Sequence, residues 1–285
     1  MTDPIPIYQA IILGIVQGIT EPLPISSTGH LRLFPRFFGW DDAGLAFDIA
    51  LHAGTLIAIV AYFWRDWIEI IRAASAKLRG QQIEDNPYIK PNLLWGLIIG
   101  CIPAGIIGLL LNDSIDSIEQ NPALNNQVMI VVASMLIIVG GVIFASDRYG
   151  AKKRHIGHMN IADWLVIGFA QAIALIPGVS RSGATMSAGL IRGLERDAAA
   201  RFSFLLSAPI VFAATMKHVV ELMHEGMPQN QILPFIVGTV TSAVVGYAAI
   251  KFLLGYVRKH NFNIFVWYRL ALGVFILILV AVRAS

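Results

Sequence analysis

Apolar segments of two lengths alternate with polar connections along this chain. Six segments approach the roughly 20 residues that a helix needs to cross the hydrocarbon core of a bilayer; they are residues 47–64, 92–111, 127–146, 198–218, 232–256 and 265–282. Four others are too short or too interrupted by Gly and Pro to cross, namely residues 4–20, 31–40, 161–175 and 182–193. Because these short segments occur as two consecutive pairs, we expect each pair to form a re-entrant hairpin that enters and leaves the membrane on one face.

The chain also repeats itself. Each short pair precedes three long segments, which divides one transmembrane domain, residues 1–285, into repeats of about residues 1–154 and 155–285. The two hairpin turns align at a constant offset without a gap, matching Gly14 with Gly168, Gln17 with Gln171, Ser26 with Ser180, Thr28 with Ser182 and Gly29 with Gly183. Three crossings are an odd number, so the second repeat should lie upside down relative to the first. The predicted fold is an all-α polytopic membrane protein with an inverted-topology repeat, whose hairpin turns meet inside the bilayer.

Composition supports a membrane protein and excludes several other classes. The chain is 56% hydrophobic and only 14% charged, with a mean hydropathy of +0.68, whereas soluble domains carry about 25% charged residues. The net charge of +3 is too small to indicate a nucleic-acid partner. The single Cys101 cannot form an intramolecular disulfide. Residues 1–8 lack the pattern of a signal peptide, so we do not expect them to be removed as one.

The positive charges are distributed unevenly between the connections. Most Lys and Arg residues fall in the connections 65–90, 148–154, 192–201 and 258–259, which share one side of the membrane in this arrangement. The positive-inside rule places that side in the cytoplasm. Both termini are then predicted to be extracytoplasmic, and residues 66–91 form the one long soluble loop.

Glu21 stands where the first short helix should break. An acid in apolar sequence is costly unless it is paired, protonated or bound to a cation. Gln17 lies one helical turn earlier, so two oxygen-bearing side chains share a helix face. Such a pair suits Mg²⁺ or Ca²⁺, which prefer oxygen ligands and bridge to phosphate. A satisfied structural acid is the alternative interpretation.

Hydroxyl groups and one imidazole follow in the same turn. Ser26, Ser27 and Thr28 are typical of a helix N-cap, with Gly29 adding backbone freedom. Capping does not explain His30, which follows Ser27 by three residues and can act beside it as a general base or as the nucleophile. A lone structural histidine is the alternative.

The second turn, residues 177–185, is the more informative pattern. Its glycines permit close backbone approach, its hydroxyls can donate, and the helix that follows offers free N–H groups to an anion. These residues are Gly178, Ser180, Ser182, Gly183 and Thr185. Arg181 adds a planar fork that matches phosphate bidentately. The pattern predicts a phosphate or diphosphate cradle, or alternatively a tight turn in which Arg181 pairs with Glu21.

Asp48 and His52 are one helical turn apart near the start of a long segment. We interpret them as residues that orient the site from behind it. A buried pair that only stabilises its helix fits the spacing equally well.

These motifs resemble the two signatures of the bacterial undecaprenyl-diphosphate phosphatase family, also called bacitracin-resistance proteins. The resemblance rests on Gln17, Glu21 and residues 26–30, on residues 177–185, and on the flanking segments 47–52 and 201–206. It implies an inner-membrane enzyme with inverted repeats that hydrolyses undecaprenyl diphosphate to the monophosphate. This reaction recycles the lipid carrier of peptidoglycan synthesis and underlies bacitracin tolerance.

The resemblance also implies dependence on a divalent cation, Mg²⁺ or Ca²⁺. The family accepts Glu or Gln at the position of Gln17, so this chain keeps Glu21 as the metal-binding acid and lacks a second one there. Arg181 and the hydroxyls of the second turn would hold the phosphate oxygens. Ser27 activated by His30, or His30 itself, would attack the terminal phosphorus, with Ser26 as the less favoured hydroxyl.

The partners that follow are a polyprenyl diphosphate lipid and the bilayer, and a homodimer is compatible with the sequence.

Two other functions share some of these features. A lipid flippase or an ion-coupled transporter can use the same inverted-repeat fold, and fold alone does not choose between transport and hydrolysis. A phosphatidic-acid-phosphatase type of enzyme also has a Ser-Arg element. Here, however, Ser187 stands where that family requires His, and no upstream Lys is followed by Arg-Pro.

Overall fold

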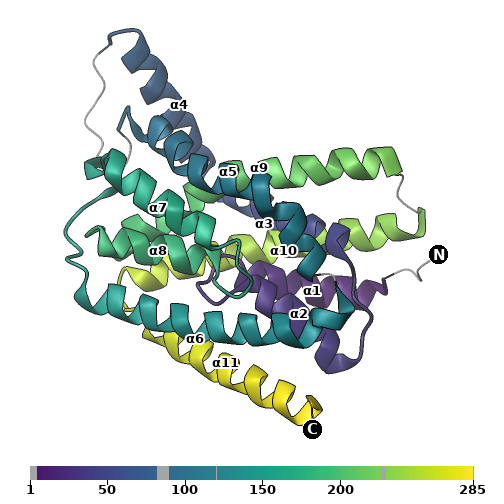
Figure 1. The fold of residues 1–285 in the computed structure, drawn as a ribbon. Helices are drawn as coiled ribbons and strands as arrows, with labels where there is room; N and C mark the ends of the chain where they lie inside the picture. The colour runs from purple at the N-terminus through teal and green to yellow at the C-terminus, as the bar shows by residue number, and fades with distance from the viewer. Residues whose placement is uncertain (1–4, 82–89, 120, 226–228, 285) are drawn as a thin grey trace.

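The computed structural model describes residues 5–81, 90–119, 121–225 and 229–284, and the regular elements in these ranges are helices (Figure 1). They are α1 (Ile7–Thr20), α2 (Ser27–Phe38), α3 (Leu45–Tyr62), α4 (Trp64–Leu78), α5 (Leu93–Glu119), α6 (Asn125–Tyr149), α7 (Ile161–Ile173), α8 (Arg181–Ile191), α9 (Arg196–Glu225), α10 (Gln229–Val257) and α11 (Asn263–Ala284). Two short 3₁₀ helices, η1 (Pro122–Leu124) and η2 (Ile156–His158), precede α6 and α7.

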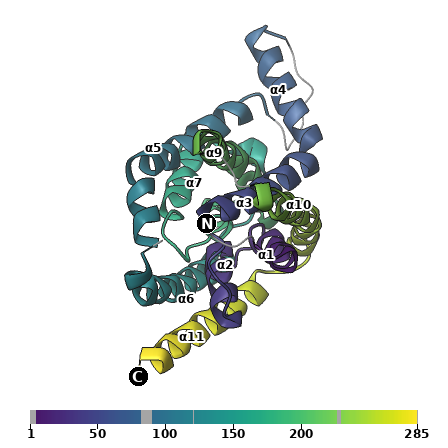
Figure 2. The same ribbon diagram turned by 90° about the vertical axis from the view of Figure 1, so that its right-hand side faces the viewer.

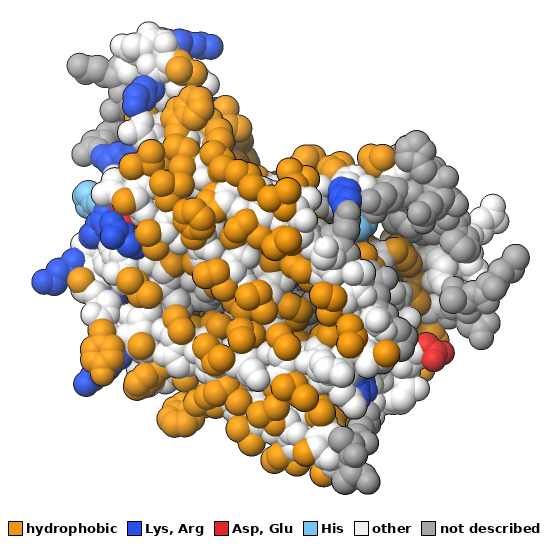
Figure 3. All heavy atoms as spheres, viewed as in Figure 1, with side chains coloured by type: hydrophobic (Ala, Val, Ile, Leu, Met, Phe, Trp, Pro, Cys, Tyr) orange, Lys and Arg blue, Asp and Glu red, His pale blue; other side chains and the backbone are white. Residues whose placement is uncertain are grey.

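Six of these helices, α3, α5, α6, α9, α10 and α11, are long and apolar enough to cross a membrane. They coincide with the six long segments expected from the hydrophobic pattern, so the prediction of an all-helical polytopic membrane protein is confirmed at this level. In Figure 3 apolar side chains cover the middle of the visible face, and Lys and Arg gather at its left-hand edge. This is the edge at which α6 ends and α7 begins in Figure 1.

The predicted long soluble loop, residues 66–91, is in part a helix. Helix α4 occupies most of its first half and projects from the bundle in Figure 1. The helix forms because Ile70, Ala73 and Ala74 recur at helical spacing and are buried on one face. Residues 82–89 of that loop lie outside the described residues. Helix α5 likewise continues to Glu119, past the predicted end of its segment at residue 111.

The four short segments form two helix pairs, α1 with α2 and α7 with α8. Figure 1 shows α7 and α8 on the left of the bundle and α1 and α2 on its right, with the turn of each pair directed toward the centre. In Figure 2, α7 lies inward of α5 and α9, and α2 lies between α6 and α1. Both pairs are therefore enclosed by longer helices on several sides.

The turns end in nearly the same backbone conformation, which supports the repeat found in the sequence. Ser26 has φ 72° and ψ 98°, and its counterpart Ser180 has φ 70° and ψ 112°. A positive φ costs a residue with a side chain roughly 1–3 kcal/mol, and such strain is concentrated at functional sites. Ser26, just before α2, and Ser180, just before α8, both carry this backbone strain.

Each repeat packs its first short helix against a long helix of the other repeat. A Cβ atom added at Gly14 of α1 would lie 2.8 Å from the Gly238 carbonyl oxygen of α10. A Cβ at the matching Gly168 of α7 would lie 2.4 Å from the Gly100 carbonyl oxygen of α5. Glycine at both positions lets the helix backbones touch, as is common where helices pack in membranes. These contacts set the position of each first short helix and of the turn that follows it.

Candidate active site between the two turns

A cavity of about 150 Å³ lies where the two turns meet. Residues from both turns, from α3 and from α9 line it: Glu21, Ser26, Ser27, Thr28, His52, Ala174, Ile176, Gly178, Ser180, Arg181 and Val211. The structure thus brings together polar groups that lie far apart in the sequence. Most of the predicted site residues are among them.

The strongest polar contact across the cavity joins the two turns directly. Arg181 Nη2 lies 2.6 Å from Glu21 Oε1, and the two side chains are only 15% and 8% exposed. This confirms the pairing that the sequence offered as one alternative. An ion pair shielded this well holds both partners in place, because removing one leaves a buried charge at a cost of about 3–5 kcal/mol.

Three further groups lie near the other carboxylate oxygen of Glu21, Oε2. The Ser27 hydroxyl donates a short hydrogen bond to Oε2. The amide nitrogen of Gln17 lies 3.4 Å from the same oxygen, and His52 Nε2 lies 3.5 Å from it. Glu21 is therefore the centre of the site, surrounded by one hydroxyl and several donors.

His52 has a larger part in this site than the spacing with Asp48 suggested. Its Nδ1 lies 2.8 Å from the Asp48 backbone carbonyl, while Nε2 faces the Glu21 carboxylate. The two ring nitrogens of His52 therefore lie against an oxygen of its own helix and an oxygen of Glu21. Asp48 acts on the site through its backbone, and its carboxylate lines a neighbouring cavity instead.

The structure does not bring His30 to the cavity. Its Nδ1 lies 2.7 Å from the Ser26 carbonyl, and its Nε2 lies 2.7 Å from the Tyr268 hydroxyl of α11. Ser27 and His30 share part of a helix face, but Ser27 turns to Glu21 and His30 turns to Tyr268. A catalytic role for His30 stays a prediction, and the imidazole nearest to Glu21 is that of His52.

Some polar groups of the second turn line the cavity, and others form hydrogen bonds that hold the turn in place. Gly178, Ser180 and Arg181 line the cavity. Ser180 also caps α8, its hydroxyl accepting from the Gly183 N–H at 3.2 Å. Ser182 instead donates to the Leu23 carbonyl of the first turn at 3.0 Å. Its position indicates that it ties the two turns together rather than facing a ligand.

Thr185 also helps to hold the second turn in place. Its hydroxyl lies 2.8 Å from the Arg181 carbonyl and 2.6 Å from the Ser203 hydroxyl of α9. Gly183 is buried within α8. Neither of them lines the cavity, so the predicted anion cradle is smaller than the motif suggested.

Two helices begin at the cavity and direct their N-terminal ends at it. Helix α2 starts at Ser27 and α8 starts at Arg181, and both residues line the cavity. The first N–H groups of a helix lack helical partners and carry partial positive charge. The cavity therefore joins two such ends with one guanidinium, which suits a phosphate group.

Arg269 of α11 was not singled out in the sequence, although a charge in an apolar segment is the signal that reveals such residues. Its side chain is fully buried and reaches both turns. It donates to the carbonyls of Pro24 at 3.2 Å, Gly178 at 3.0 Å and Val179 at 3.1 Å. Two further bonds reach the carbonyls of Leu136 and Met135 in α6. Arg269 thus clamps the turns from behind the cavity.

The residues present are compatible with one divalent cation. Among the described residues no three His, Cys, Asp or Glu side chains form a metal-binding group. The Gln17 Oε1 oxygen is, however, buried without a hydrogen-bond partner in the described structure, close to the Glu21 carboxylate that its own amide nitrogen contacts. Mg²⁺ binds to one or two such oxygens when phosphate and water supply the remaining ligands.

Comparisons with known proteins agree on one family. The model of the family described as "Bacitracin resistance protein BacA" matches residues 10–275. A protein of Thermomicrobium roseum named undecaprenyl-diphosphatase is 44% identical over 276 residues, which cover 96% of this chain and 98% of that protein. Proteins of the same name from Desulforudis audaxviator and Moorella thermoacetica are 44% and 45% identical, over 97% and 95% of this chain and 98% and 96% of their own lengths.

Proposed function

Because the chain belongs to the bacitracin resistance protein BacA family, we propose that it is a membrane phosphatase that converts undecaprenyl diphosphate to undecaprenyl phosphate and inorganic phosphate. The product is the lipid carrier of peptidoglycan synthesis, and its recycling gives resistance to bacitracin. The observation that carries this proposal is the contact of Glu21 with Arg181, made across two turns at the cavity between them.

The proposed activity is tested by phosphate release from undecaprenyl diphosphate in detergent. We expect Arg181→Ala to lower turnover roughly 100- to 1000-fold, since it removes a cationic donor that stabilises charge on the transferring phosphoryl group. Arg148→Gln, at an exposed arginine of α6, is the matched control. Near wild-type release by purified, folded Arg181→Ala would refute the assignment. Release without a sealed membrane also separates hydrolysis from the alternative of a flippase or ion-coupled carrier.

Substrate binding would begin at the two helix ends. The terminal phosphate lies between the N-terminus of α2, the N-terminus of α8 and the Arg181 guanidinium, and Ser180 and Gly178 bound the cavity beside it. Arg181 then exchanges part of its contact with Glu21 for the phosphate oxygens. Loss of that partner makes the Glu21 carboxylate a stronger base at the moment when the substrate is in place.

Ser27 is the nucleophile that the geometry favours, because its hydroxyl already donates to Glu21. In the proposed reaction the Ser27 oxygen forms a bond to the terminal phosphorus while its proton passes to Glu21. The bond from that phosphorus to the bridging oxygen breaks, and undecaprenyl phosphate leaves with the electron pair. Glu21 passes its proton to the departing phosphate and is a carboxylate again. Water then loses a proton to Glu21 and attacks the phosphoserine; the bond from phosphorus to the Ser27 oxygen breaks, that oxygen takes the proton back from Glu21, and inorganic phosphate is released.

The nucleophile is identified by trapping labelled substrate and treating the adduct with acid and base. A phosphoserine resists acid and is cleaved by base, whereas a phosphohistidine at His30 shows the opposite stability. We expect the first pattern, and we expect no adduct in Ser27→Ala. An acid-labile adduct that persists in Ser27→Ala would assign the attack to His30.

We further propose that Glu21 and the Gln17 Oε1 oxygen hold a divalent cation, Mg²⁺ or Ca²⁺, together with the substrate phosphates. The cation would neutralise charge on the diphosphate. Gln17 directs its second group, the amide nitrogen, to Glu21 and so keeps the carboxylate oriented toward that position. Support comes from the unpaired Gln17 oxygen rather than from a preformed cluster of acids.

The arrangement of the helices in the membrane completes the proposal. The matching turns, the exchanged helix contacts and the repeated order of short and long helices support two inverted repeats with re-entrant hairpins. The edge rich in Lys and Arg would face the cytoplasm of the bacterial inner membrane, with both termini outside. Cysteines introduced at the exposed residues Ala151 and Asp41 and labelled from each side test this topology, and a homodimer is tested by crosslinking.

A further inference from the structure

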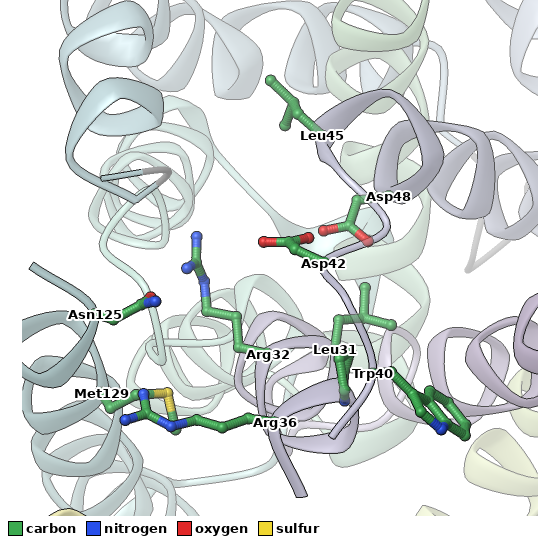
Figure 4. Close-up of a pocket in the computed structure, with 10 residues that line it drawn as sticks. Leu31, Arg32, Arg36, Trp40, Asp42, Leu45, Asp48, Asn125 and Met129 are labelled. Carbon is green, nitrogen blue, oxygen red and sulfur yellow. The ribbon is translucent and has the colours of Figure 1, made fainter. Parts of the chain in front are cut away.

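A second and larger cavity of about 430 Å³ lies beside the candidate active site. It is lined by the second half of α2, by the link from α2 to α3, and by the starts of α3 and α6: Leu31, Arg32, Pro35, Arg36, Trp40, Asp42, Leu45, Asp48, Asn125 and Met129. Figure 4 shows Arg32 and Arg36 extending from α2, with the Asp42 and Asp48 carboxylates on another wall. The function proposed above assigns no role to these four charges.

The two cavities are one helical turn apart along two walls. On α2, Thr28 lines the first cavity and Arg32, four residues later, lines the second. On α3, His52 lines the first and Asp48, four residues earlier, lines the second. One turn of helix is about 5.4 Å. A group that moves this distance along α2 and α3 passes from the residues of the first cavity to those of the second.

The direction of that movement is away from the positively charged edge of the protein. The second cavity lies where α2 ends and α3 and α6 begin, at the right of Figure 1, whereas Lys and Arg gather at the left of Figure 3. Product that leaves through the second cavity would therefore emerge on the face opposite that edge.

The chemistry of the cavity suits an anion that must be bound weakly. Two guanidinium groups match phosphate oxygens in a planar, bidentate geometry. Arg36 is oriented by a hydrogen bond of 2.6 Å to the Asn126 side chain. The carboxylates of Asp42 and Asp48 line the same cavity and lower its affinity for an anion. Two arginines alone would hold the phosphate product tightly. Two arginines with two carboxylates bind it weakly enough for it to leave.

We propose that the Arg32–Arg36 cavity is a second anion site, which takes up inorganic phosphate after it leaves the catalytic cavity. The claim that this phosphate comes from hydrolysis in the first cavity rests on the proposed phosphatase function. The claim that the second cavity binds phosphate does not. Binding of inorganic phosphate to the purified protein therefore tests it without any turnover.

The experiment measures equilibrium binding of radiolabelled phosphate in detergent. Arg181→Gln disables the first cradle, and we expect it to retain one class of phosphate site. Adding Arg32→Gln and Arg36→Gln should weaken the remaining site about tenfold or more, since charge-assisted bonds are lost. The same addition of Arg148→Gln should leave it unchanged, and Arg32→Lys with Arg36→Lys should restore most of the binding. Loss of all phosphate binding in Arg181→Gln alone, or equal binding with and without the two arginines, would overturn the proposal.

A gain of affinity provides a test that a folding defect cannot imitate. Asp42 is exposed, and Asn keeps the oxygen that accepts from the Gly44 N–H. Asp42→Asn removes a competing carboxylate and should tighten phosphate binding several-fold. During turnover the same variant should be inhibited by lower concentrations of added phosphate. Unchanged or weaker phosphate binding by Asp42→Asn would contradict the site, whereas absence of lipid hydrolysis by the wild type would contradict only the proposed function.

Discussion

Arg269 offers the sharpest test of how the structure builds the site, because it touches both turns without lining the cavity. Its guanidinium donates to the carbonyls of Pro24 in the first turn and of Gly178 and Val179 in the second. We predict that Arg269→Gln separates the turns and lowers both stability and turnover.

The magnitude follows from the bonds that are lost. Each buried carbonyl left without its donor costs about 1–3 kcal/mol. The carbonyls of Leu136 and Met135 lie within α6 and also accept helical bonds, so the three turn carbonyls set the upper bound, roughly 9 kcal/mol. The substitution also removes a buried charge, which returns several kcal/mol of desolvation cost. We therefore expect a net loss of about 3 kcal/mol, or a fall in melting temperature of roughly 6–12 °C. Because misplacement by about 1 Å can cost 100-fold in rate, turnover should fall by at least that factor.

The assay combines thermal unfolding in detergent with phosphate release from undecaprenyl diphosphate. Arg269→Lys keeps the charge but has a single donor centre instead of a planar fork, so its stability and rate should lie between those of Arg269→Gln and the wild type. Arg258→Gln is the control for loss of an arginine, since that side chain is 57% exposed and its ion pair with Asp197 contributes little. If Arg269→Gln melts within 2 °C of the wild type, as a rough margin, and hydrolyses substrate at the same rate, the clamp does not exist.

Three further predictions address the metal, the packing and the pH dependence. Glu21→Gln should weaken the dependence of phosphate release on Mg²⁺ or Ca²⁺, and an unchanged metal titration would remove Glu21 as a ligand. Gly168→Ala should destabilise the protein by about 1–3 kcal/mol, because its Cβ would lie 2.4 Å from the Gly100 oxygen. Gly105→Ala, inside α5 with nothing within 4 Å of the added Cβ, should not destabilise it, and a Gly168→Ala protein that melts no lower than the wild type would contradict the close helix contact. Burial raises the pKa of the Asp163 carboxyl, but hydrogen bonds from Arg154, Asn160 and Arg192 outweigh burial and hold that pKa below its usual value. The stability that Asp163 confers should therefore be complete above pH about 4 and be lost as the pH falls further; Asp163→Asn should lack this acid-dependent loss, and an identical acid profile would exclude the effect.

The sequence alone determined the elements of this protein because the signals for them are local. A helix that crosses a bilayer needs a long apolar run, so six such runs predicted six of the observed helices. The breaks before Ser26 and Ser180 were visible as Pro22 with Pro24 and as Pro177 with Gly178, and the alignment of the two turns was visible at a constant offset. Glu21 and Arg181 could be paired from sequence because an unpaired charge is costly at that depth.

The tertiary structure alone decided which groups reach the cavity between the two turns. The sequence placed His30 beside Ser27, but its ring contacts Tyr268 of α11 instead. His52 comes to Glu21 instead, from a helix that the local motif does not include. The same holds for Arg269, whose five carbonyl partners lie on three separate parts of the chain. Spacing along a helix gives the relative directions of its side chains, whereas the rotation of that helix is set by the neighbours on which it packs.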